Sequence, residues 1–160
     1  MKRILLLLAV LALSAVVSGP LMAQANPFVG SWKLDAAKST FTGVPAPKDL
    51  NREVVAQDGG TKFSYKGVSG DGKTIDYSFV TNYDGKDSAI TGSGAPGGAD
   101  AIAIKRVGTN KAQATLKKGG KDIGTSSSEV SKDGKVTTVK GAGKTADGKD
   151  FTTVSVFEKQ

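Results

Sequence analysis

The chain has 160 residues, and its 22 lysines and arginines outnumber its 15 aspartates and glutamates, which gives a formal net charge of +7 at pH 7. It contains no histidine and no cysteine. Catalysis by Ser-His-Asp or Cys-His groups therefore lacks its base, and zinc, copper or iron lack their usual ligands. The lysines are scattered singly rather than clustered with aromatic residues, which argues against nucleic acid as a partner. We expect a protein without metal, cofactor or disulfide.

Residues 1–25 have the three parts of a cleavable secretory signal peptide. A Lys-Arg pair is followed by an apolar run over residues 4–17, and Ala23 and Ala25 offer small side chains at the −3 and −1 positions of a cleavage site. The run has about 14 residues, short of the roughly 20 that span a bilayer, so we expect cleavage rather than a retained anchor. Residues 26–160 are then expected to form one soluble, monomeric domain. We expect it to be exported, periplasmic or secreted, without a lipid anchor or stable membrane insertion.

Short segments with the pattern of β-strands fill the rest of the chain. Glycine-containing turns recur about every ten to thirteen residues, several as Asp-Gly pairs that favour tight hairpins. The clearest strand covers residues 74–80, where apolar and polar side chains alternate. Residues 35–50 interrupt the pattern with two prolines, and there we expect one helical turn, capped by Asp35. No window of eleven or more residues keeps an apolar helical face, so the pattern predicts an all-β domain.

Ten strands can be counted, beginning at residues 28–34. Successive short strands joined by hairpins remove their exposed edges by closing on themselves. The predicted fold is therefore an antiparallel up-and-down β-barrel of 8–10 strands over residues 26–160. Leu, Ile, Val and Phe are sparse for this length, which favours a hollow or polar-lined interior over a solid two-layer sandwich.

Residues 26–34, Asn-Pro-Phe-Val-Gly-Ser-Trp-Lys-Leu, resemble the opening of the calycins, the superfamily of lipocalins and fatty-acid-binding proteins. The opening is also similar to that of small secreted bacterial proteins described as lipocalin-like. The resemblance implies that Trp32 plugs one end of the barrel and that Gly30 lets the chain pass close beside it. Residues 128–136 and 156–159 are similar to the late hairpin and the last strand of fatty-acid-binding proteins.

Two departures from the fatty-acid-binding pattern concern the ligand. Residues 35–50 are too short and too proline-rich for the pair of helices that lids the family's cavity, so a cavity here is either open or covered by a loop. The family holds a carboxylate with Arg-x-Tyr on its last strand, and the matching positions are Ser155 and Phe157. Neither side chain neutralises a carboxylate. Alternation does not decide which face of this last strand points inward.

Arg52 and Arg106 are the candidate anchors for an anionic group, because each shares a strand face with apolar residues and a guanidinium binds carboxylate or phosphate in two-pronged fashion. The alternative is that each arginine lies at a strand end and reaches water. Tyr65, Tyr77 and Phe79 are candidate stacking surfaces in a cavity, with core packing as the alternative.

The leading functional hypothesis is a non-enzymatic, exported binding protein that holds a small hydrophobic or anionic amphipathic ligand in its barrel. Its candidate contacts are Arg52, Tyr65, Tyr77, Phe79, Arg106, Ser155 and Phe157. A second hypothesis is an envelope or periplasmic interaction protein whose barrel is filled and carries no small molecule. Catalysis is a third, which the absence of histidine and cysteine disfavours.

Overall fold

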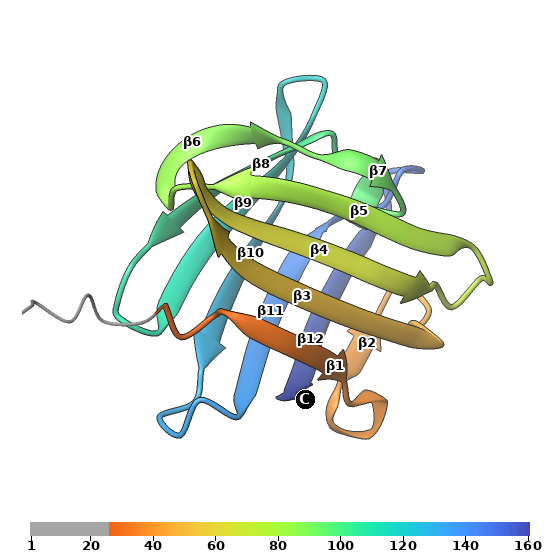
Figure 1. The fold of residues 1–160 in the computed structure, drawn as a ribbon. Helices are drawn as coiled ribbons and strands as arrows, with labels where there is room; N and C mark the ends of the chain where they lie inside the picture. Colours follow the sequence, from red (N-terminus) through yellow and green to blue (C-terminus); the bar gives the residue numbers. More distant parts are fainter. Residues whose placement is uncertain (1–25) are drawn as a thin grey trace, which may run out of the picture.

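Over residues 26–160, twelve antiparallel strands form one sheet that rolls into a nearly closed barrel (Figure 1). The structure, a computed structural model, describes residues 26–160; the expected signal peptide, with Ala23 and Ala25, lies outside the described residues. The elements are β1 (Gly30–Leu34), η1 (Ala36–Lys38), β2 (Thr40–Thr42), β3 (Asp49–Gln57), β4 (Gly60–Val68), β5 (Thr74–Thr81), β6 (Asp84–Ala89), β7 (Thr91–Ser93), η2 (Pro96–Gly98), β8 (Ala101–Arg106), β9 (Lys111–Lys118), β10 (Lys121–Val130), β11 (Val136–Lys144) and β12 (Asp150–Lys159).

The strand order confirms the predicted barrel. Strands follow β6-β8-β9-β10-β11-β12-β1-β3-β4-β5-β7, and β2 adds to β12. The first strand, β1, lies between the last strand and the third. Trp32 of β1 is paired with Lys159 of β12 on one side and with Arg52 of β3 on the other. Within residues 26–160 no ladder joins β5 to β6; instead β6 pairs with β8, and β7, which follows it, pairs with β5. In Figure 1 the wall of β3, β4 and β5 crosses in front of the wall of β9 to β12.

The structure has two more strands than the ten that were counted, and both lie where loops were expected. β2 pairs with the middle of β12 before the two prolines of residues 35–50, and β7 pairs with β5 at the start of a glycine-rich segment, residues 92–98. β11 continues its ladder with β12 through Gly141 and Gly143 and ends at Lys144. The helical turn is confirmed, since Asp35 Oδ1 accepts hydrogen bonds from the backbone N–H groups of Ala37 and Lys38 at 3.0 and 3.2 Å.

The burial of alternate residues shows which face of β12 points inward. Phe151 and Phe157 are buried, and alternation along the strand places Thr153 and Ser155 on the same face. The pairing of Phe157 with the buried Thr137 of β11 fixes this register. The candidate residues Ser155 and Phe157 therefore both face the interior.

One end of the barrel interior, here called the filled end, is packed with apolar side chains. Trp32 is 1% exposed, and its Nε1 donates a hydrogen bond to the backbone oxygen of Phe28 at 3.0 Å. Gly30 has φ +140°, and a Cβ there would lie 2.6 Å from Cε of Lys159, whose Nζ is 5.3 Å from the centroid of the Trp32 ring. The glycine thus leaves room for the lysine stem beside the tryptophan. The other members of this buried cluster are Phe28, Val54, Phe63, Phe79, Ile102, Ile104, Ala112, Val130 and Phe157.

Candidate functional site

The other end of the barrel opens into a cavity of about 430 Å³, here called the mouth cavity. Apolar side chains dominate its wall, and four loops or turns form its rim together with the ends of β3, β5 and β12. Its volume lies within the range of about 300–1,000 Å³ that is usual for small-molecule sites. The lining includes Phe41, Val44, Pro45, Pro47, Leu50, Ser69, Asp71, Lys73, Ile75, Tyr77, Pro96, Thr145, Phe151, Thr153 and Ser155.

Tyr77 marks the aromatic floor of the mouth cavity. Its ring stacks on Tyr65, its cross-strand neighbour, with ring centroids 4.7 Å apart and planes inclined by 12°. The next pair toward the filled end, Phe63 and Phe79, stacks at 5.1 Å. Burial raises the pKa of Tyr77 well above its usual value. Of the three predicted stacking residues, Tyr77 lines the mouth cavity, whereas Tyr65 and Phe79 lie one layer deeper.

Arg52 lies beneath that floor and is only 2% exposed. Its Cζ is 5.2 Å from the ring centroid of Trp32 and 4.7 Å from that of Phe157. Arg52 also lines a small inner cavity of about 50 Å³, together with Tyr65 and Phe79. Burial lowers the pKa of Arg52, and Tyr65 partly offsets the effect; a guanidinium nevertheless keeps its proton in proteins.

Arg106 was a candidate anchor for an anionic ligand, but it lies away from both cavities. It lies at the filled end, where Nη2 donates to Oδ1 of Asn26 and Nη1 donates to the backbone oxygen of Thr109, both at 2.9 Å. Its Cζ is 4.2 Å from the ring centroid of Tyr83 and 5.2 Å from that of Phe28. Arg106 lines neither cavity, so its contacts give it a structural role in closing this end.

Sequence reasoning missed the loop residues that shape the mouth cavity. Phe41, Val44 and Pro45 come from the segment before β3, and Pro96 comes from η2. The two prolines and the glycine-rich segment indicated only that these stretches were not long strands. Their common position at one rim depends on the barrel, which brings segments about fifty residues apart in the sequence together.

Two turns on the rim share the sequence Ser/Thr-x-Asp-Gly-Lys and the same internal hydrogen bonds. In each, the hydroxyl of the first residue accepts the backbone N–H of the lysine, at 2.9 Å in residues 69–73 and 3.0 Å in residues 145–149. The hydroxyl also donates to the aspartate. The neighbouring lysine and hydroxyl lower the pKa of Asp71 and of Asp147 to about 2.

We expect the free energy of unfolding to be nearly constant between about pH 5 and pH 9, since no histidine or cysteine titrates there. The lowered pKa of Asp71 and Asp147 stabilises the fold above the unfolded value of 3.8, and this contribution is lost as the pH falls toward about 2. The raised pKa of the buried Tyr77 acts at the other limit, so stability falls again above about pH 10. Thermal melting against pH tests this profile. Asp71→Asn with Asp147→Asn should make the acid limb shallower and leave the alkaline limb unchanged, while Asp35, Asp84 and Asp133, whose pKa values are also lowered, keep part of the acid limb. An unchanged acid limb would contradict the assignment.

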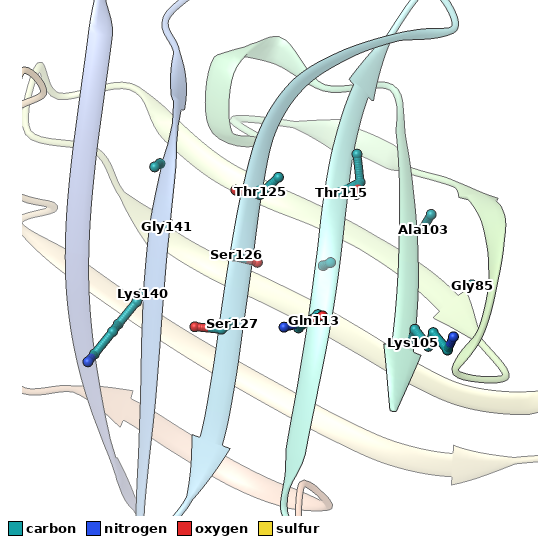
Figure 2. Close-up of a pocket in the computed structure, with 12 residues that line it drawn as sticks. Gly85, Ala103, Lys105, Gln113, Thr115, Thr125, Ser126, Ser127, Lys140 and Gly141 are labelled. Carbon is teal, nitrogen blue, oxygen red and sulfur yellow. The ribbon is translucent and has the colours of Figure 1, made fainter. Parts of the chain in front are cut away.

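A second hollow lies on the outer surface of β8 to β11 and measures about 590 Å³ (Figure 2). Its lining residues at outward positions, such as Ala103 and Lys105, alternate with the buried Ile102 and Ile104. Figure 2 shows short hydroxyl and methyl side chains across its floor and the longer Lys105 and Lys140 nearer its edges. The mouth cavity is the more apolar of the two hollows, and we take it as the candidate ligand site.

Within residues 26–160, no three acidic side chains gather closely enough to form a metal site. The same part of the chain has no helix of the length and apolar character needed to cross a membrane.

An antiparallel meander closed by its first and last strands, with a buried tryptophan from Gly-x-Trp on the first strand, defines a calycin-like barrel. Among solved structures, the chain is similar to zebrafish ileal bile acid-binding protein complexed with cholic acid. The two chains are 16% identical with a TM-score of 0.49, and the match covers 84% of this chain and 99% of the zebrafish chain. No family model and no curated protein sequence matches the chain.

Proposed function

We propose that this protein is a non-enzymatic carrier that binds a small apolar or amphipathic molecule in the mouth cavity. The observation that carries the proposal is an open, mainly apolar cavity whose floor is the ring of Tyr77, which stacks on Tyr65 beneath it. Thr153 and Ser155 add hydroxyl groups on the β12 side, which suits a ligand with a few polar atoms. The features of residues 1–25 support export, to the periplasm or the exterior, as the setting in which the ligand is met.

The alternative, an interaction protein with a filled barrel, draws on the packing of the filled end. A barrel that needed only a solid interior would gain free energy by closing its mouth as well, since buried apolar surface stabilises by about 25 cal/mol per Å². The open mouth cavity therefore favours ligand binding over a purely structural barrel.

Binding of the fluorescent probe 1-anilinonaphthalene-8-sulfonate, followed by competition with a panel of small amphiphiles, tests the proposal. We expect Tyr77→Leu to weaken probe binding about fivefold, because an aromatic contact contributes roughly 0.5–1.5 kcal/mol beyond its area. Val80→Ala is the matched control, since Val80 lies on the same strand and its side chain is exposed. Equal affinities in the two variants, or no saturable binding by the wild type, would reject the mouth cavity as the site.

A further inference from the structure

Arg52 is the one charged side chain that is buried within residues 26–160. No carboxylate of these residues lies within 4.0 Å of it, since Arg52 takes part in none of their ion pairs. Its contacts include the rings of Trp32 and Phe157, on which the guanidinium lies, and Tyr65, its neighbour across the β3–β4 ladder, whose side chain partly offsets the lowering of the Arg52 pKa by burial. Cation–π contacts offset only part of the cost of removing a charge from water.

The hydrogen-bonding state of the guanidinium is equally unusual. Nε and Nη2 are buried and have no hydrogen-bond partner among the described residues. These two nitrogens form one edge of the planar group, with parallel N–H bonds that match two oxygens of a carboxylate or nitrate. A buried donor without a partner is costly. An acceptor from outside the protein would remove this cost, because the described residues supply none to these two nitrogens.

The space beside Arg52 sets the size of that acceptor. The inner cavity holds about 50 Å³, far less than the mouth cavity, and Ser126 and Ser128 add hydroxyl groups to its wall. Arg106, the other arginine of residues 26–160, differs because both of its Nη atoms already have acceptors. A compact cavity, a fixed positive charge and two buried donors without a partner are therefore all found at Arg52.

We propose that Arg52 is a buried anion-binding site that takes one compact monovalent anion, either an inorganic ion or the carboxylate head of a bound molecule. The site lies one layer below the mouth cavity, separated from it by the Tyr65–Tyr77 pair. The proposal goes beyond the carrier function and does not depend on it.

The single tryptophan of the chain, Trp32, provides a local probe of this site. In the wild type we expect bromide to quench its fluorescence saturably, whereas neutral acrylamide should quench weakly because Trp32 is 1% exposed. At constant ionic strength, replacing bulky gluconate by nitrate or bromide should raise Tm by about 4 °C or more over a hundredfold concentration range. Weak, linear quenching by bromide and a Tm that follows ionic strength alone would overturn the proposal.

Arg52→Met removes the cation and should abolish both the saturable quenching and the anion-dependent shift in Tm. Arg106→Met is the matched control and should keep both, because Arg106 does not line the inner cavity. Retention of the anion effect in Arg52→Met would also overturn the proposal. The wild-type titration remains decisive if a variant fails to fold.

Decanoate and decanol distinguish the two sources of the anion. If decanoate displaces bromide and binds at least tenfold more tightly than decanol, the carboxylate head occupies the site. If bromide quenching persists under saturating decanoate, an inorganic anion occupies it; both results support an anion site at Arg52. If the wild type showed saturable bromide quenching but no saturable binding of the fluorescent probe, the carrier function would be contradicted and the anion site at Arg52 would stand.

Discussion

Replacing Trp32 by alanine is expected to lower the free energy of unfolding by about 4 kcal/mol, because large aromatic-to-alanine changes in a core cost roughly 3–5 kcal/mol. The ring is 1% exposed, and its Nε1–H···O bond to Phe28 holds the segment that precedes β1. The change would leave a cavity between Arg52 and Lys159, both of which contact the indole face. A loss of this size is a large share of the 5–15 kcal/mol that stabilises an ordinary domain.

Urea unfolding followed by circular dichroism measures the loss without relying on tryptophan fluorescence. Trp32→Phe is the matched control and should cost less, since it keeps a ring beside Arg52 and removes the hydrogen bond to Phe28. Val55→Ala, at a position that is 45% exposed, should change stability little. A Trp32→Ala variant as stable as Val55→Ala would show that the tryptophan does not hold the barrel closed.

Gly92→Ala is expected to destabilise the protein by roughly 3 kcal/mol and to weaken probe binding in the mouth cavity. Gly92 has φ +101°, and an added Cβ would lie 2.1 Å from the backbone oxygen of Asp76. Its partner across the ladder is Tyr77, the floor of the cavity. The methyl group would therefore push β7 away from β5 at the seam where, within residues 26–160, no ladder joins β5 to β6.

Gly119→Ala is the control that separates the two causes of this loss. Gly119 also has a positive φ, +56°, but no atom lies within 4 Å of an added Cβ. It should cost only the left-handed conformation of a non-glycine residue, about 1 kcal/mol. Chemical unfolding of both variants, with probe titration, measures the difference; equal losses would show that the close approach of β7 to β5 does not matter.

The arrangement of the barrel was largely predictable because it follows from local chemistry. Asp-Gly turns set the hairpins, alternation set the strand faces, and Asp35 capped the one helical turn that was expected. The two extra strands, β2 and β7, were not predictable, because three residues carry too little pattern and their ladders depend on distant partners.

The candidate site was predictable only in its strand residues. Tyr77 and Ser155 lie at the mouth cavity as inward positions of β5 and β12, but the loop side chains around them could not be assigned from pattern alone. The two arginines looked alike in sequence, since each shared a face with apolar residues. The partners at 2.9 Å that occupy Arg106, and the aromatic rings that surround Arg52, come from other strands and from the N-terminal segment.

By itself the sequence determined an all-β domain with hairpin turns, no histidine or cysteine chemistry, and the Gly-x-Trp of the first strand. These properties depend on residue type and short-range periodicity, which the chain carries locally. The tertiary structure alone decided which half of the barrel is filled, which face of β12 points inward, and that Nε and Nη2 of the buried Arg52 have no acceptor among residues 26–160. Burial and hydrogen-bond satisfaction are properties of contacts between strands far apart in sequence, so they exist only once the barrel has closed.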